Sequence, residues 1–288
     1  MLLLGASAAL IAVLVAQIWL VTARPRSSRV LDAWHSRGTT FVVRDDRGWR
    51  ELVAEDGRRS MVHTRVKVTD LLVSGLRYTD GFHLAVALAG PPRHTVFIGA
   101  GGAIGPRQFA SFYPDGEIDA VDIDASILRA ARRFFSLADC HRLRTHVGDG
   151  RAFLVAAADR RFDIVVLDAY DGPGRMVEDL ATAEFFAMAR CKLRPGGVLC
   201  ANLVGNPGLH PSAGRIAAAI SAAFTGQSRV FRVPECDQSP GNCIALAIRG
   251  SAAPEWDDLS RRAQALDRRV RFAAAIARHP VVAAASTG

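Results

Sequence analysis

The chain has 288 residues, of which 50% are hydrophobic, so it is long enough to bury a core and too apolar to be a disordered polypeptide. Its formal net charge is +8, and among its lysines and arginines only Lys67 and Lys192 are lysines. No basic run alternates with aromatic residues, as it does in proteins that bind single-stranded nucleic acid, so a nucleic-acid partner is not expected.

The first 23 residues contain no charged side chain. Their length matches the roughly 20 apolar residues of a membrane-spanning helix. Arg24, Arg26 and Arg29 follow at once, and positive charge on this side keeps the rest of the chain in the cytoplasm. We therefore expect Met1–Ala23 to be a membrane anchor or uncleaved signal. The segment also ends in residues that suit a cleavage site, so export after signal cleavage is the alternative.

Residues 24–70 are predicted to hold a linker and a small antiparallel β unit. Short alternating runs between residues 39 and 68 are broken at Asp46-Arg47-Gly48 and at Glu55-Asp56-Gly57. Turns of this composition join the neighbouring strands of a hairpin.

A larger domain is predicted over residues 71–250. Its first segment, Leu71–Leu88, has the apolar spacing of a helix and carries Tyr78. The tail, residues 251–288, contains an arginine-rich stretch, Trp256–Arg278, that is predicted to form one amphipathic helix.

The stretch from His94 to Asp124 has the pattern of a strand, a glycine loop, a helix and a second strand. The first strand ends at Gly99, Gly101 and Gly102, where the backbone can turn tightly and approach a ligand. The second strand brings Asp122 to the same edge of the sheet. In open α/β sheets nucleotides bind at this edge, and a carboxylate in this place binds the ribose hydroxyls. We interpret the stretch as a nucleoside-binding site.

The glycine loop does not carry the full dinucleotide fingerprint. That fingerprint has a third glycine where this chain has Ile104, so NAD is not expected and an adenosine-type ligand is favoured. Glycine-rich turns also occur as plain connections from a strand to a helix, which is the alternative interpretation.

Acidic residues follow two further predicted strands. Asp149 and Gly150 come after the first of them, and Asp168 and Asp171 come after the buried apolar strand Asp163–Leu167. Carboxylates at the end of a buried strand are unfavourable unless they are paired or take part in a site. We therefore treat the aspartates as candidate site residues.

Predicted strands and helices alternate through the chain, which indicates an α/β fold with a mainly parallel sheet and helices on both faces. One of the helices follows Asp124, which can cap it. No helix separates the last two strands, Ser228–Val233 and Asn242–Ile248, so these are expected to be antiparallel neighbours.

The five cysteines are an odd number without a metal-ligand spacing, so no metal site is expected. Cys191 and Cys200 lie in apolar runs and are predicted to be buried. Cys236 and Cys243 flank a predicted turn. A disulfide between them is left open, because a reducing compartment would keep them as thiols.

The chain contains, in this order, the motifs GAGGAIGPR, VDID, VGDGRAF, VVLDAYDG, ATAEFF and LRPGGVLCANL. This order resembles the spermidine synthase family of polyamine aminopropyltransferases, in particular its diverged bacterial members. The resemblance covers roughly residues 40–250. It implies a Rossmann-like, methyltransferase-type sheet of seven strands, preceded by a small N-terminal β unit.

The resemblance also implies an activity, the transfer of an aminopropyl group from decarboxylated S-adenosylmethionine to a small-molecule amine such as putrescine. Asp122 would hold the ribose of the donor, and Asp149 and Gly150 would lie on the adenine side. The glycine loop would lie against the sulfonium portion. No metal is implied.

On the acceptor side, the resemblance makes Asp168 the base that takes a proton from the amine, with Asp171 and Tyr78 orienting the polyamine nitrogens. The chemistry requires such groups, because the attacking amine must be neutral and aligned with the carbon next to the sulfonium. A carboxylate within hydrogen-bond reach can accept its proton and stabilise cationic nitrogens. A homodimer is one option for the assembly, which the sequence does not decide.

The chain departs from the family pattern at Gly102, where family members usually carry an aspartate that binds the aminopropyl ammonium, and at Ser60, where a glutamine is expected. Asp122 replaces the usual glutamate, which is a milder change. Two other functions therefore stay open. One is a methyltransferase that uses S-adenosylmethionine itself, and the other is a membrane-tethered nucleoside-binding protein without turnover.

Overall fold

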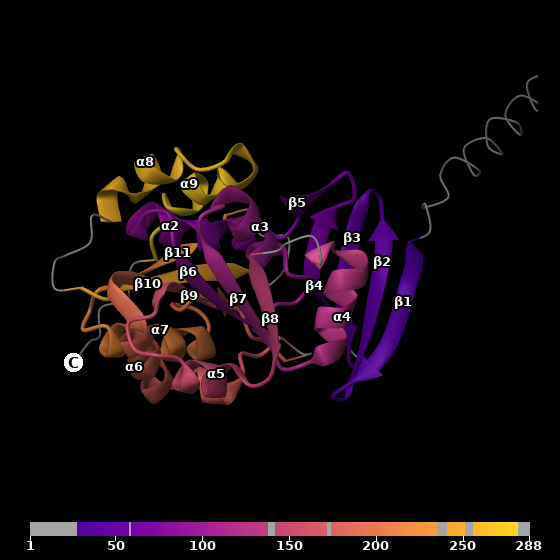
Figure 1. Cartoon of the computed structure of the whole chain (residues 1–288), viewed down its shortest axis with the longest axis horizontal. Coiled ribbons are helices and arrows are strands. Elements are labelled where there is room, and N and C mark those ends of the chain that lie inside the picture. Colours follow the sequence, from indigo (N-terminus) through magenta and orange to yellow (C-terminus); the bar gives the residue numbers. More distant parts are fainter. Residues whose placement is uncertain are drawn as a thin grey trace, which may run out of the picture.

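The computed structural model describes residues 28–57, 59–137, 142–171, 174–234, 241–250 and 256–281. Within them the chain forms a five-stranded sheet and then a seven-stranded sheet with helices on both faces (Figure 1). This arrangement confirms the predicted α/β fold and the small β unit that precedes it. No helix in these ranges is long and apolar enough to cross a membrane. The anchor predicted at Met1–Ala23 lies outside them.

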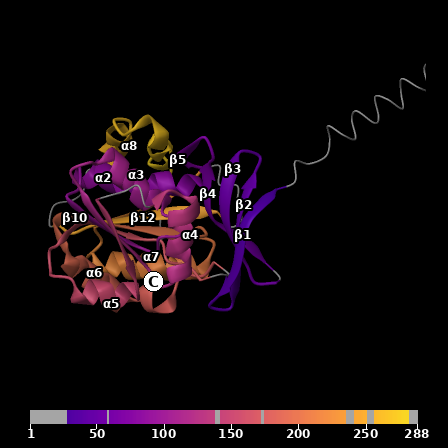
Figure 2. The same cartoon turned by 45° about the vertical axis from the view of Figure 1, so that its right-hand side comes forward.

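The N-terminal sheet is antiparallel, and its strands follow one another in space as they do in sequence. They are β1 (Arg29–Ser36), β2 (Thr39–Asp46), β3 (Trp49–Glu55), β4 (Ser60–Lys67) and β5 (Asp70–Ser74). Apolar side chains of this sheet, among them Val43 and Leu52, belong to one buried cluster with Ile127 of the main domain. This cluster holds the small sheet beside the main one (Figure 2).

The predicted hairpins of this sheet are confirmed, but the sheet has an additional strand at each end. The prediction of a helix over Leu71–Leu88 is wrong at its start, where the chain forms β5. A short apolar run does not distinguish a strand from a helix by its periodicity, and here the pairing of Ser74 with Val66 of β4 decides the outcome. The remainder of the segment forms the 3-10 helix η1 (Arg77–Phe82) and the helix α2 (His83–Ala89).

The main sheet has the strand order β11-β12-β10-β9-β6-β7-β8. Neighbours from β10 to β8 in this order are parallel, whereas β12 is antiparallel to both β10 and β11, which confirms the prediction for the last two strands. Strand β9 is buried at every position, and it is apolar except for Asp163 near its start. The bounds are β6 (His94–Ile98), β7 (Glu117–Asp122), β8 (Leu143–Val147), β9 (Phe162–Leu167), β10 (Leu193–Val204), β11 (Ser228–Arg232) and β12 (Asn242–Ile248).

Helices cover both faces of the main sheet (Figure 1). Helices α2, α3, α8 and α9 pack on one face, α5, α6 and α7 pack on the other, and α4 lies between the two sheets. Asp124 caps α4 as predicted, because its side chain accepts a hydrogen bond from the amide of Ser126 at 2.8 Å. The bounds are α3 (Ile104–Phe112), α4 (Ala125–Phe134), α5 (Gly150–Ala156), η3 (Glu178–Leu180), α6 (Ala183–Lys192), α7 (Pro211–Ala223), α8 (Leu259–Ala263) and α9 (Phe272–Ile276).

The C-terminal tail is not the single amphipathic helix predicted over Trp256–Arg278. It contains η4 (Trp256–Asp258), α8, η5 (Arg268–Val270) and α9. A new element begins where the side chain of Asp267 accepts a hydrogen bond from the amide of Arg269 at 2.9 Å. Buried residues of α8 and α9 belong to one core cluster with those of α2, so the apolar stripe of the tail folds back into a cap on the main sheet.

The cysteines differ in their surroundings. Cys200 is buried in β10 as predicted, whereas Cys191 is exposed near the end of α6. The prediction for Cys191 is wrong because two phenylalanines and an alanine form the buried face of that helix. Cys236, the candidate disulfide partner of Cys243, lies outside the described residues.

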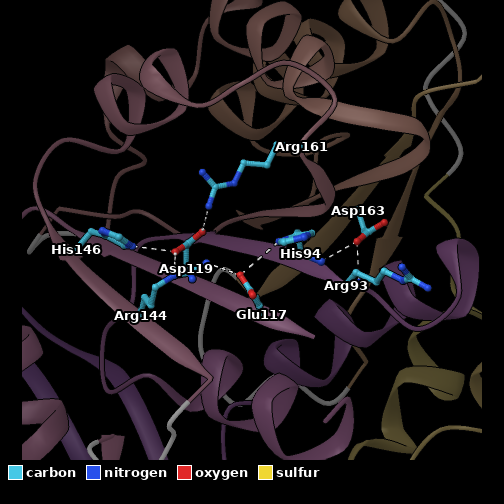
Figure 3. A network of polar contacts seen from close by, with 8 residues as sticks. All are labelled: Arg93, His94, Glu117, Asp119, Arg144, His146, Arg161 and Asp163. Atoms are coloured by element: carbon cyan, nitrogen blue, oxygen red, sulfur yellow. Dashed lines mark hydrogen bonds and ion pairs between the residues drawn. The ribbon is translucent and has the colours of Figure 1, made fainter. Parts of the chain in front are cut away.

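Charged side chains join the amino-terminal ends of the parallel strands (Figure 3). Asp119 of β7 accepts hydrogen bonds from Arg144 at 3.1 Å and His146 at 2.9 Å, both on β8. Arg161, just before β9, donates to the other oxygen at 3.0 Å. Burial alone would raise the pKa of Asp119, but the hydrogen bonds from His146 and Arg144 outweigh it and lower that pKa. The carboxylate is therefore held ionised and connects three strands.

A second acid extends this network along the same edge (Figure 3). Asp163 of β9 accepts hydrogen bonds from the backbone amides of Arg93 and His94, both at 2.7 Å. It also pairs with Arg194 of β10. The strands are therefore tied together at their amino-terminal ends, and ligand chemistry is expected at the opposite edge.

One buried carboxylate is not satisfied in this way. Asp80 in η1 is 1% exposed, and neither of its carboxylate oxygens has a hydrogen-bond partner among the described residues. The guanidinium of Arg77, about half exposed, lies 3.8 Å away. Burial raises the pKa of Asp80 to about 7, and the charge of Arg77 offsets only part of that rise.

Asp80→Asn should stabilise the protein, and more so at high pH. Because folding raises the pKa of Asp80, its contribution to stability is complete below its ordinary pKa near 4 and is lost as the pH rises through about 7. The amide cannot ionise, so the variant should gain up to about 4 kcal/mol of unfolding free energy at about pH 8 and much less at about pH 4.5. Urea unfolding at both pH values measures this gain. An equal gain at the two values would contradict the assignment.

Candidate active site

A cavity of about 600 Å³ opens at the carboxyl ends of the parallel strands. Binding sites for small molecules usually have volumes of roughly 300–1,000 Å³. Strand β4 of the N-terminal sheet and the loops after β6, β7, β8 and β9 line this cavity. All predicted site residues except Gly102 are in the lining. They are Tyr78, Gly99, Gly101, Asp122, Asp149, Gly150, Asp168 and Asp171.

Gly99 allows the glycine loop to pack directly against the backbone of Asp168. Its φ is +88°, in the left-handed region that favours glycine, and a Cβ at this position would lie 2.2 Å from the carbonyl oxygen of Asp168. The amide of Asp168 in turn donates to the carbonyl of Ile98 at 2.9 Å. The glycine loop after β6 and the backbone of Asp168 after β9 therefore lie side by side.

Asp122 at the end of β7 holds the glycine loop in place. Its carboxylate accepts hydrogen bonds from the amides of Ala100 at 3.0 Å and Gly101 at 3.3 Å. The amide of Asp124 donates to its other oxygen at 2.9 Å. Burial raises the pKa of Asp122, and these three amides oppose the rise. Contact of this carboxylate with a ribose stays a prediction.

Asp149 and Gly150 place the start of α5 beside the cavity. The side chain of Asp149 accepts a hydrogen bond from the amide of Ala152 at 2.7 Å and so caps the helix. A Cβ at Gly150 would lie 2.3 Å from Cγ2 of Ile98, so glycine is needed for α5 to begin this close to β6. Asp149 itself is exposed.

Gly102 is the predicted site residue that the cavity lining does not include. Its amide donates to the hydroxyl of Thr64 in β4 at 2.8 Å, and a Cβ there would lie 2.6 Å from Cγ2 of Thr64. Thr64 is buried and lines the cavity. The structure therefore places Thr64, and not Gly102, in the cavity wall.

Asp168 directly follows β9, and its backbone lies against Gly99 of the glycine loop. Its Oδ1 accepts a hydrogen bond from Nδ2 of Asn202 at 2.8 Å, and its Oδ2 accepts one from the hydroxyl of Tyr78 at 3.3 Å. Burial raises the pKa of Asp168 to about 6, and the two hydrogen bonds oppose that rise. The carboxyl group is therefore mostly ionised at neutral pH and can still accept a proton.

Several polar side chains around Asp168 were not predicted. Oδ1 of Asn202 in β10 accepts a hydrogen bond from Nδ2 of Asn242 in β12 at 2.9 Å. The hydroxyl of Tyr170 donates to the carbonyl of Asn202 and accepts from the amide of Val204. The available signal was the asparagine within the apolar run LCANL, because a buried polar side chain requires hydrogen-bond partners.

Asp171 lines the cavity but is bound by its own loop. Its Oδ1 accepts a hydrogen bond from the amide of Arg175 at 2.8 Å, and its Oδ2 lies 3.4 Å from Nε of the same arginine. Its side chain is 39% exposed. The structure therefore brings Tyr78 to Asp168 and engages Asp171 separately.

The cavity is acidic although the protein is basic. The chain has a net charge of +8. Among the described lining residues, by contrast, Arg37 is the single arginine, and five are aspartates. Excess negative charge in a concave site attracts cations. The aspartates are Asp122, Asp124, Asp149, Asp168 and Asp171.

Gly102→Ala should destabilise the protein through Thr64. The new Cβ would overlap Cγ2 of Thr64, and overpacking of this kind costs about 1–3 kcal/mol. Thr64→Ser removes that methyl group and keeps the hydroxyl that accepts from the Gly102 amide. The double variant should therefore recover most of the loss, as measured by a double-mutant cycle of urea unfolding. Simple additivity of the two changes would contradict this account.

Known proteins are similar to this chain in sequence and in fold. A polyamine aminopropyltransferase from Vibrio vulnificus is 30% identical over 192 residues, which cover 66% of this chain and 61% of that protein. Putrescine N-methyltransferase 2 from Nicotiana attenuata is 35% identical over 135 residues, which cover 44% of this chain and 35% of that protein. This chain thus matches less than two thirds of the length of either relative. A probable spermidine synthase from Corynebacterium glutamicum shares the fold, with a TM-score of 0.67 and 19% identity over 89% of this chain and 99% of that chain.

A family model described as the spermine/spermidine synthase domain matches residues 82–234. This region contains the glycine loop, Asp122, Asp168 and Asn202, and the N-terminal sheet precedes it. Because the match covers more than half of the chain, this protein belongs to the spermine/spermidine synthase family.

Proposed function

We propose that this protein is an aminopropyltransferase that moves the aminopropyl group of decarboxylated S-adenosylmethionine to a small amine such as putrescine. Asp168 carries this proposal, because its half-buried carboxylate has a pKa of about 6 and its backbone lies against Gly99 of the glycine loop. A base with this proton affinity can take a proton from an amine near neutral pH. The acidic lining of the cavity and the family membership support the same proposal.

The donor would bind with its nucleoside along the ends of β6, β7 and β8. Asp122 lines that part of the cavity and suits the ribose hydroxyls, while Asp149 and Gly150 suit the adenine. The sulfonium would then lie close to Gly99 and Asp168, since these two residues are in contact.

In the proposed reaction, the acceptor nitrogen attacks the carbon bonded to the sulfonium. A C–N bond forms while the C–S bond breaks, and the bonding electrons leave with sulfur to give the thioether methylthioadenosine. The acceptor ammonium must lose a proton before it can attack, and Asp168 accepts that proton and later releases it to solvent. Tyr78 donates to Asp168 and would orient the acceptor.

Asp168→Asn should keep donor binding and lower kcat about 10²- to 10⁴-fold, the usual effect of losing a general base. In the unaltered protein, kcat should fall as the pH drops through about 6, because protonated Asp168 cannot take a proton. Steady-state rates across pH and calorimetry with the donor measure both effects. Asp115→Asn, the same change at an exposed position outside the cavity lining, is the matched control. Full activity of Asp168→Asn would exclude this role.

The products identify the reaction. Full-length protein with putrescine and the decarboxylated donor should yield spermidine and methylthioadenosine, as detected by mass spectrometry. An N-methylated amine and S-adenosylhomocysteine, formed from S-adenosylmethionine, would support a methyltransferase instead. Tight binding of an adenosyl donor without either product would support a nucleoside-binding protein without turnover.

A methyltransferase is the second candidate, and the pairing of Gly102 with Thr64 favours it. Next to the glycine loop the cavity wall offers the side chain of Thr64, which is neutral. Intact S-adenosylmethionine keeps its own carboxylate, which a carboxylate in this wall would repel and a hydroxyl does not. The relative from Nicotiana attenuata is named a putrescine N-methyltransferase.

We also propose that Met1–Ala23 anchors the protein in a membrane with the cavity on the cytoplasmic side. The segment has no charged side chain, and arginines follow it directly. Full-length protein should pellet with membranes and resist high-salt washing, because salt screens ionic contacts and leaves apolar ones in place. Release by salt, or a mature N-terminus at Arg24, would contradict the anchor.

A further inference from the structure

Two asparagine side chains connect Asp168 to the antiparallel strand β12. Nδ2 of Asn202 donates to Oδ1 of Asp168 at 2.8 Å, and Nδ2 of Asn242 donates to Oδ1 of Asn202 at 2.9 Å. Asn202 is 2% exposed and Asn242 is 7% exposed, so bulk water cannot easily replace either partner. The two amides form one chain of hydrogen bonds that ends on the carboxylate.

The chemistry of its members fixes the direction of this chain. An ionised carboxylate only accepts hydrogen bonds, whereas an asparagine amide has an NH₂ group that donates and an oxygen that accepts. Asn202 can offer its NH₂ group to Asp168 only when its oxygen faces Asn242. Asn242 must then be the donor, which is what the structure shows.

The register of the strands brings the two asparagines together. Strands β10 and β12 are antiparallel, with Asn202 opposite Ile244 and Asn242 opposite Val204. The asparagines are therefore diagonal neighbours on one face of the sheet. The hydroxyl of Tyr170 also donates to the carbonyl of Asn202, so the loop after β9 holds β10 at the same point.

Neutral hydrogen-bond donors stabilise the ionised form of Asp168. Burial opposes its ionised form, and the hydrogen bonds from Asn202 and Tyr78 favour that form. Tyr170 of the same loop and Cys200 of β10 also face Asp168, and burial raises the pKa of both, so both stay neutral. Other titratable residues that line the same cavity are Arg37, His63, Asp122, Asp124, Asp149 and Asp171.

We propose that Asn242 is a positioning residue for the transfer reaction: it turns the Asn202 amide so that the NH₂ group faces Asp168, and so keeps Asp168 in the ionised form that takes a proton from the acceptor. The inference rests on the proposed function, because that function makes Asp168 the base. In this role Asn242 acts through Asn202 and need not touch the reacting atoms.

Asn242→Asp tests the orientation with almost no change of shape. In its ionised form the new carboxylate can only accept, so Asn202 would turn its NH₂ group toward residue 242 and its oxygen toward Asp168. The added negative charge acts in the same direction. The pKa of Asp168 should rise by at least about one unit, so kcat at about pH 5 should fall about tenfold and return toward the wild-type value above about pH 9. The KM for the donor should not change.

Asn242→Leu separates orientation from charge, because leucine is neutral and neither donates nor accepts. The acidic limb of the kcat–pH profile, where kcat falls as Asp168 becomes protonated, should shift less than in Asn242→Asp. The shift should disappear in an Asn202→Leu background, since the proposed effect passes through Asn202. Asn206→Asp is the matched control, because it adds the same charge after β10 but outside the cavity lining. It should not shift the acidic limb of the kcat–pH profile.

Two results would overturn the proposal. One is that folded Asn242→Asp has the same acidic limb of the kcat–pH profile as the wild type. The other is that the shift of this limb in Asn242→Leu persists in the Asn202→Leu background. If Asn242→Asp does not fold, the comparison of Asn242→Leu with and without Asn202→Leu is sufficient as the test. Titration of the Asp168 carboxyl by ¹³C NMR measures the same shift in pKa without turnover. Its signal is identified as the one that is missing in Asp168→Asn. A shifted titration without aminopropyl transfer would therefore reject the proposed function and retain the role of Asn242.

Discussion

Strand β9 approaches the glycine loop so closely that no side chain fits between them. A Cβ at Gly99 would lie 2.2 Å from the carbonyl oxygen of Asp168, and the Asp168 amide donates to the carbonyl of Ile98. This contact brings the glycine loop and Asp168, the proposed proton acceptor, to one place. Asp122 stabilises the loop through its amides, and Asn202 stabilises the carboxylate through its NH₂ group. The remaining lining completes a cavity around this contact.

The order of the main-sheet elements was predictable because each element leaves a local pattern. Phe162–Leu167 is buried throughout, and the apolar run from Ile164 to Leu167 shows in the sequence. The predictions for Leu71–Leu88 and Trp256–Arg278 are wrong because their conformations depend on partners distant in the chain. Pairing with β4 makes a strand of the first segment's start, and the second segment packs with α2 as the short helices α8 and α9.

The candidate site was predictable where it follows from strand ends. Asp122, Asp149 and Asp168 were placed correctly at the cavity, because parallel strands share one carboxyl edge. Thr64 and Asn242 were missed for a physical reason. Thr64 comes from a separate sheet, and Asn242 reaches the site through the register of two antiparallel strands. Neither of these contacts leaves a periodic pattern in the sequence.

Strand β4 contributes Thr64 to the cavity wall, while Asp168, the proposed proton acceptor, follows β9 of the main sheet. The family model begins at residue 82, so it does not include this wall. Substitutions in β4 can therefore alter which molecules fit without altering the proton acceptor. In evolutionary terms, if Asp168 acts as proposed, the choice of substrate and the chemistry are separable, and a lineage could acquire a new substrate through the small sheet while it keeps its mechanism.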